Sequence, residues 1–275
     1  MILYRTTRGS WLEEKGRYVE VPGEWDALFG RRDLAAFLRQ AMRDGAPQRR
    51  LPRGSTLLAP IGRQEVWAAG VTYARSRAAR VSESKAAGGS DFYDRVYHAV
   101  RPELFFKATP HRVVGHGGAL RLRHDSRWIV PEPELTLAIS SQGRIFGYTI
   151  GNDLSCRDIE GENPLYLPQA KTFARCAALG PGILVTGRPM PPGTVIVLDI
   201  RRRGRSVFAG AARVSEIRKP LPALVDYLYR DNVFPVGCLL MTGTGIVPPE
   251  RLSLRRGDEV RITVQPIGTL VNRME

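Results

Sequence analysis

The sequence has little of several features that define specialised classes of protein. Its 275 residues include three cysteines, Cys156, Cys176 and Cys238, with no C-x-x-C spacing. An odd and scattered set excludes a disulfide framework and a zinc site, so we interpret all three as packing residues. No run approaches the ~18 consecutive apolar residues of a membrane span, and the start lacks the apolar core of a signal peptide. We therefore expect a cytoplasmic protein without membrane contact.

Lysine and histidine are also scarce. Of the 41 basic residues only five are lysines, and the net charge is +14. A basic protein attracts anionic metabolites or nucleic acid, but the positive residues are scattered and only Arg201-Arg202-Arg203 forms a run. We therefore predict no nucleic-acid partner. The four histidines, at positions 98, 111, 116 and 124, lack metal-ligand spacing, and we interpret them as structural or exposed.

The first fifty residues have the pattern of a small α/β unit. Short strands are expected at Ile2–Thr6 and Arg17–Val21. A helix capped by Asp33 follows, with apolar residues at helical spacing, and Gly45-Ala46-Pro47 ends it. The polar segment 48–54 resembles a linker. We therefore predict two domains, a small α/β domain over residues 1–55 and a larger one over residues 56–275.

The larger domain has the pattern of a β-rich α+β fold. Helices are expected at Ala74–Ala87 and Asp91–Val100, broken by Gly88-Gly89, and at Pro222–Arg230. Most other apolar runs are short, β-branched and closed by Gly or Pro. The expected strands are Trp128–Val130, Glu134–Ile139, Phe146–Ile150, Gly182–Val185, Thr194–Ile200, Phe208–Val214 and Glu259–Gln265.

Carboxylates gather in the segment Pro131-Glu132-Pro133-Glu134-Leu135. Residues i and i+2 of a strand face the same side, so Glu132 and Glu134 present two carboxylates side by side. If the chain reverses at residues 140–143, antiparallel pairing brings Asp153 within their reach. Three converging carboxylates suit a hard divalent cation such as Mg²⁺. Solvated strand positions are the ordinary alternative for two glutamates.

Several short segments carry a resemblance to a known family. They are Gly70-Val71-Thr72-Tyr73, Phe105-Phe106-Lys107, the pair Glu132 and Glu134, residues 147–158 ending in Cys156-Arg157-Asp158, Ala170-Lys171-Thr172-Phe173, and Thr242-Gly243-Thr244-Gly245. In this order they resemble the fumarylacetoacetate hydrolase family over roughly residues 60 to 270. The resemblance implies a mixed β-sandwich roll, a homo-oligomer, and Mg²⁺ or Mn²⁺ bound by Glu132, Glu134 and Asp153. It also implies a small 2-oxo acid or β-diketone substrate.

One departure from the family pattern bears on the reaction. Hydrolase and decarboxylase members carry a water-activating His–Glu pair, and the corresponding residues here are Ser76 and Ala79. Without that pair, C–C cleavage loses its general base. The sequence looks instead like the branch that dehydrates 2-keto-3-deoxy sugar acids. A five-carbon substrate would then give 2,5-dioxopentanoate through a metal-stabilised enolate.

We assign roles to side chains on this reading. Lys171 removes the C3 proton, helped by a pKa lowered near Mg²⁺, and Glu103 protonates the departing C4 hydroxyl. The expected substrate-binding residues are Tyr73, Phe106, Lys107, Thr242, Gly243 and Thr244. Which of Lys171 and Glu103 is the C3 base stays open. Two alternatives also stay open: a C–C bond hydrolase or decarboxylase of acylpyruvates or oxaloacetate, and a basic nucleic-acid-binding module.

Overall fold

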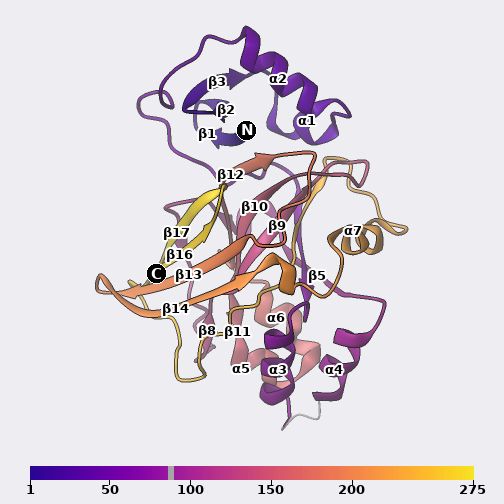
Figure 1. Ribbon diagram of the computed structural model, residues 1–275. Helices are drawn as coiled ribbons and strands as arrows, with labels where there is room; N and C mark the ends of the chain where they lie inside the picture. The colour runs from indigo at the N-terminus through magenta and orange to yellow at the C-terminus, as the bar shows by residue number, and fades with distance from the viewer. Residues whose placement is uncertain (86–89) are drawn as a thin grey trace.

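The computed structural model describes residues 1–85 and 90–275, which form a sheet-rich α+β fold (Figure 1). A ten-stranded sheet has the strand order β3-β2-β1-β12-β10-β9-β15-β4-β5, with β6 paired to β12. Its strands are β1 (Ile2–Thr6), β2 (Gly9–Glu14), β3 (Arg17–Val21), β4 (Glu65–Gly70), β5 (Glu103–Ala108), β6 (Val113–Val114), β9 (Pro133–Ile139), β10 (Ile145–Asp153), β12 (Ala177–Val185) and β15 (Cys238–Met241).

A second sheet of five strands packs against the large one, with the order β14-β13-β16-β17-β7. It contains β7 (Ala119–Leu120), β13 (Val195–Arg202), β14 (Arg205–Arg213), β16 (Glu259–Val264) and β17 (Gly268–Met274). The short strands β8 (Ile129–Val130) and β11 (Ser155–Cys156) pair with each other. The main hydrophobic core lies between the two sheets, and it buries β9 and β10 on that side. This architecture confirms the predicted β-rich α+β class.

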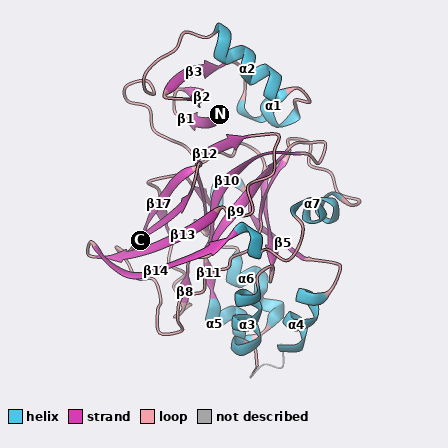
Figure 2. Cartoon of the chain, viewed as in Figure 1, coloured by secondary structure: helices cyan, strands magenta, loops and turns pink. Residues whose placement is uncertain are grey.

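Most helices lie at the two ends of the sheets, and α7 lies beside them (Figure 2). They are α1 (Trp25–Gly30), α2 (Leu34–Asp44), α3 (Ala74–Glu83), α4 (Ser90–His98), α5 (Arg157–Glu162), α6 (Leu167–Lys171) and α7 (Leu221–Tyr229), with single 3₁₀ turns at Pro110–Arg112, Pro164–Tyr166 and Val214–Glu216. Figure 2 shows α3, α4, α5 and α6 together at the end of the sheets far from α1 and α2. Within the described chain, no helix is long and apolar enough to cross a membrane.

The N-terminal unit continues the large sheet. Strand β1 pairs with β12, where Leu3 lies opposite Ile183, and the same hydrophobic cluster includes residues of β1–β3, α1, α2 and the central strands. Phe29 of α1 meets Phe146 edge to face, with ring centroids 4.9 Å apart. The division of the chain at residue 55 stays a prediction, and one sheet runs through both parts.

Some local expectations differ from the structure. Helix α2 begins after Asp33 as predicted, but the Asp33 side chain makes no capping hydrogen bond. Helix α3 ends at Glu83, where the N–H of Ser84 bonds to Arg80 O, four residues before the predicted end. The predicted break at Gly88-Gly89 lies outside the described residues. Strand β2 was not predicted, because its polar residues Ser10, Glu13 and Glu14 hide the strand pattern.

Candidate active site

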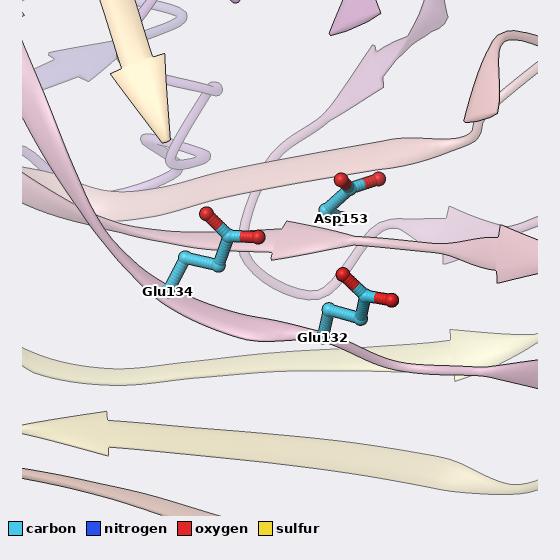
Figure 3. A group of neighbouring side chains, drawn as sticks. All are labelled: Glu132, Glu134 and Asp153. Atoms are coloured by element: carbon cyan, nitrogen blue, oxygen red, sulfur yellow. The ribbon is translucent and has the colours of Figure 1, made fainter. Parts of the chain in front are cut away.

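Three carboxylates converge at the open end of the β9–β10 hairpin. The chain reverses after Ile139 as predicted, and the antiparallel register places Glu134 opposite Gly151. The Asp153 N–H donates to Glu132 O at 3.0 Å. The side chains of Glu132, Glu134 and Asp153 are buried and face a common space (Figure 3). One oxygen from each lies within 4.8 Å of the others, so the predicted convergence is confirmed.

The electrostatics of this group favour a cation. Burial raises the pKa of Glu134 well above its usual value, and the neighbouring Asp153 and Glu132 charges raise it further. The Gly243 N–H, which donates to Glu134 Oε2, opposes this rise. A divalent cation between the three side chains would remove the repulsion that keeps Glu134 protonated. An all-oxygen, all-carboxylate set is also the ligand chemistry that Mg²⁺ prefers.

The three carboxylates belong to a larger set of buried and partly buried charged groups. We call it the ion cluster; it comprises Arg80, Glu83, Glu103, Lys107, Glu132, Glu134, Asp153, Arg157, Glu160 and Lys171. Six carboxyl groups face four cationic groups, so full ionisation leaves two negative charges. One divalent cation neutralises them. Two protons would do the same, and Glu103 and Glu134 are the carboxyls of the cluster whose pKa is raised.

We call Glu132, Glu134 and Asp153 the metal group. Lys171 lies at the end of α6, and its amine contacts two of these three carboxylates. The Nζ atom is 3.0 Å from Glu132 Oε2 and 3.1 Å from Asp153 Oδ2, and it donates to Ser155 Oγ at 2.7 Å. Burial lowers the pKa of Lys171, but Asp153 and Glu132 outweigh burial and raise the pKa above its usual value. In the metal-free protein the pKa of Lys171 is thus shifted in the opposite direction to the one predicted beside Mg²⁺, which stays a prediction. A cation that engages the same two carboxylates would weaken their effect on Lys171.

Glu103 begins β5 and lies opposite Gly70 of β4. Burial of its carboxyl, followed by the charge of Glu160, raises the pKa of Glu103 to about 7, although Lys171 and Arg80 act in the opposite direction. A carboxyl group with this pKa carries a proton near neutral pH and can donate it. Glu103, Lys171 and the three carboxylates line one cavity.

The structure separates the predicted substrate-binding residues into two groups. Gly243 and Thr244 line the cavity. Phe106 does not line it, because alternation along β5 turns this side chain toward Trp67, with ring centroids 5.9 Å apart, and its role in binding substrate stays a prediction. Phe105 lines the cavity instead, with Lys171 Nζ 5.5 Å from the centre of its ring.

Three further predicted residues are buried around the cavity without lining it. Lys107 Nζ is 2.6 Å from Asp153 Oδ1 and donates to Leu154 O at 3.0 Å, so it supports a carboxylate of the metal group. Thr242 Oγ1 donates to Leu135 O at 2.8 Å. Tyr73 precedes α3, where its N–H donates to Ser76 Oγ at 3.3 Å.

Three ion pairs near the cavity were not predicted from the sequence. Arg80 of α3 lies 2.7 Å from Glu132 Oε1 and 3.0 Å from Glu160 Oε1, and Arg157 of α5 lies 2.8 Å from Glu83 Oε1. The available signals were the i, i+3 spacing of Arg80 and Glu83 and the position of Glu160 soon after Asp153. Neither signal predicts that α3 packs against α5. The three cysteines are free and buried, as predicted.

Comparison with known proteins identifies a family and several similar proteins. Residues 65–275 match the fumarylacetoacetate (FAA) hydrolase C-terminal family. The chain is 47% identical to 2-dehydro-3-deoxy-D-arabinonate dehydratase of Saccharolobus solfataricus, over 77% of this chain and 72% of that protein. It is 46% identical to a probable 2-keto-3-deoxyxylonate dehydratase of Haloferax volcanii, over 78% and 73% of the two chains.

A solved relative shares the whole architecture. The structure of 2-keto-3-deoxy-D-arabinonate dehydratase complexed with magnesium and 2,5-dioxopentanoate aligns with a TM-score of 0.85 at 36% identity, covering 100% of this chain and 99% of that one. Family match, relatives and geometry agree with the resemblance carried by the sequence motifs. This chain belongs to the fumarylacetoacetate hydrolase family.

Proposed function

We propose that this protein is a Mg²⁺-dependent hydro-lyase that dehydrates a 2-keto-3-deoxy sugar acid, such as 2-dehydro-3-deoxy-D-arabinonate, to 2,5-dioxopentanoate. The observation that carries the proposal is the placement of Glu132, Glu134 and Asp153 in one cavity with Lys171 and Glu103. The similarity to dehydratases, one of them solved with magnesium and 2,5-dioxopentanoate, supports it. Mn²⁺ has the same ligand preference and is the alternative metal.

Charge balance supports a monoanionic substrate. Mg²⁺ held by the three carboxylates supplies a Lewis acid that polarises a 2-oxo group and stabilises negative charge. With the metal bound, Glu134 ionised and Glu103 protonated, the ion cluster has one surplus positive charge. The carboxylate of a 2-oxo acid neutralises it. Burying an uncompensated charge is costly, so the site favours this class of ligand over neutral sugars.

Lys171 and Glu103 carry the two proton transfers. Lys171 first gives its own proton to solvent, a loss that the bound cation favours because it weakens the pull of Glu132 and Asp153 on the amine. The neutral Nζ then accepts the proton of C3, and Ser155 Oγ lies within hydrogen-bond distance of the amine. The C4–O bond then breaks, and Glu103 gives its proton to the departing hydroxyl, which leaves as water. The raised pKa of Glu103 keeps this proton available near neutral pH. Tautomerisation through the C5 enol completes the conversion to the aldehyde.

A substrate panel tests the proposed function. The full-length protein is incubated with Mg²⁺ and 2-keto-3-deoxy pentonates and hexonates, and products are identified by mass spectrometry. We expect loss of one water per substrate, an intact carbon skeleton and no turnover with excess chelator. Release of pyruvate or CO₂ as the main product would instead indicate C–C cleavage, the competing reaction in this family.

A further inference from the structure

Glu160 is a buried carboxylate of the cavity to which the proposed reaction gives no role. It lies in α5, seven residues after Asp153, and is 3% exposed. Its Oε1 atom is 3.0 Å from Arg80 Nε. Its Oε2 atom is buried and has no hydrogen-bond partner within residues 1–85 and 90–275. An ionised oxygen left without a donor in a buried site is costly, so it suits a ligand that brings a donor.

The position of Glu160 relates it to the far end of the substrate. The Arg80 guanidinium bridges Glu160 and Glu132, with Nη2 2.7 Å from Glu132 Oε1. The Arg80 guanidinium therefore lies between Glu160 and the metal group. The charge of Glu160 acts on Glu103, the proposed donor to the C4 oxygen. Glu103 and Glu160 line the same cavity, so a substrate with C1 and C2 at the metal group and C4 at Glu103 has Glu160 among the groups available to its next carbon.

We propose that Glu160 binds the terminal C5 hydroxyl of the substrate, with its free Oε2 accepting the hydroxyl proton in a hydrogen bond. This inference rests on the proposed function and deepens it, because it makes the enzyme select 2-oxo acids that carry a hydroxyl at C5. Glu160 is a positioning residue in this role. A site whose buried acceptor requires a hydroxyl discriminates strongly against the analogue that lacks it.

A matched pair of unreactive ligands tests the role of Glu160. Neither 2-oxopentanoate nor 5-hydroxy-2-oxopentanoate has the C4 hydroxyl that dehydration removes, and the two differ only at C5. Their affinities for the Mg²⁺-loaded full chain are measured by titration calorimetry. Hemiketal formation by the hydroxy acid lowers its apparent affinity equally for every variant. The readout is therefore the change between variants in the affinity ratio of the two ligands.

Glu160→Gln is compared with Glu83→Gln. The amide oxygen introduced by Glu160→Gln can keep the contact with Arg80, but the carboxylate acceptor for the hydroxyl is lost. Glu83 also pairs with Arg80 and Arg157 but does not line the cavity, so its variant controls for disturbance of the ion cluster. We expect the preference for the hydroxy acid to fall about 10-fold or more in Glu160→Gln, as for loss of a hydrogen bond to a charged group. The ratio in Glu83→Gln should match wild type.

The outcomes separate the two proposals. Equal ratios in wild type and Glu160→Gln would overturn the role of Glu160 while leaving the dehydratase proposal intact. Failure of both 2-oxo acids to bind wild type would overturn the proposed function as well. If Glu160→Gln does not fold, a crystal structure of the wild type with Mg²⁺ and the hydroxy acid decides. The ligand hydroxyl should lie within hydrogen-bond distance of Glu160 Oε2, and a hydroxyl bonded elsewhere would refute the inference.

Discussion

At the scale of single residues, Lys171 is the side chain whose loss should separate chemistry from metal binding. It contacts two carboxylates of the metal group, but it is a cation and not a ligand. Lys171→Met should lower kcat by at least ~10²-fold, the lower end for loss of an acid–base group. Mn²⁺ affinity measured by calorimetry should be retained. Loss of Mn²⁺ binding together with activity would assign Lys171 a structural role.

Ser76 supplies the matched control for that variant. It lines the same cavity, and its Oγ donates to Tyr73 O at 2.8 Å at the start of α3. If elimination of water is the reaction, Ser76→Ala removes a local cap and no proton carrier. We expect a small effect on kcat, far below that of Lys171→Met. If steady-state kinetics gave a loss of kcat comparable to that of Lys171→Met, C–C cleavage with a base other than histidine would become the better explanation.

The pKa of Glu103 predicts the pH dependence of the reaction. Its raised value of about 7 keeps the carboxyl protonated at lower pH, and the acid form is lost as pH rises through that value. The profile of kcat/KM should therefore fall on the alkaline side of about pH 7. Glu103→Gln should have much lower activity, and its kcat/KM profile should lack this fall on the alkaline side. If the alkaline fall of kcat/KM were unchanged in the variant, the ionisation would belong to another group.

The three metal-group residues that were predicted lie in one local hairpin, whereas some site residues that were not predicted meet only through packing between separate helices. Glu132, Glu134 and Asp153 belong to one hairpin, so strand alternation and a turn near residue 142 predict their meeting. Arg80 and Glu160 meet only because α3 packs beside α5. No local pattern encodes that contact. Phe105 could have been preferred to Phe106, since residues 103, 105 and 107 share one face of β5.

At the scale of elements, the β4–β5 register fixes the place of the Glu103 carboxyl. Gly70 lies opposite Glu103, and a Cβ on Gly70 would come 2.0 Å from Glu103 Oε2. Gly70→Ala should displace this flexible side chain and lower kcat about as much as Glu103→Gln. The thermal unfolding temperature should change little. Gly193→Ala, where nothing lies within 4 Å of the new atom, is the control. Wild-type kcat in Gly70→Ala would contradict the proposed position of the acid.

Elements with strong local signals were predicted well, and those formed by tertiary pairing were not. The apolar run of β9 and the turn after it predict the central hairpin. Strand β15 (Cys238–Met241) has only four residues and is defined by pairing with β4 and β9, which are distant in sequence. Helices α5 and α6 have six and five residues, too short for helical periodicity to appear.

At the scale of the whole molecule, we relate the N-terminal unit to the oligomeric state of the protein. Residues 1–50 cover one edge of the large sheet through β1 and bury apolar residues of β12. We propose that the protein is a homo-oligomer whose assembly this unit shapes. Light scattering at micromolar concentration should give a multiple of 30.6 kDa, and the monomer mass would refute the proposal.

The charge balance of the ion cluster makes Mg²⁺ stabilise the fold more strongly as pH rises. Glu134 and Glu103 have raised folded-state pKa values. Their contribution to the free energy of unfolding is therefore present below their unfolded pKa and is lost as pH rises through the folded values. Mg²⁺ replaces those protons, so its binding strengthens over the same range.

The unfolding temperature measures this linkage. At about 100 times its Kd, Mg²⁺ adds about 2.7 kcal/mol, or about 5–10 °C in Tm for a chain of this size. The Mg²⁺-induced shift should be clearly larger at about pH 8 than at about pH 5.5, as followed by scanning calorimetry. Glu134→Gln removes a ligand and should abolish most of the shift at both values. Equal shifts at the two pH values in wild type would show that Mg²⁺ does not replace protons of the cluster, and would place the metal away from Glu132, Glu134 and Asp153.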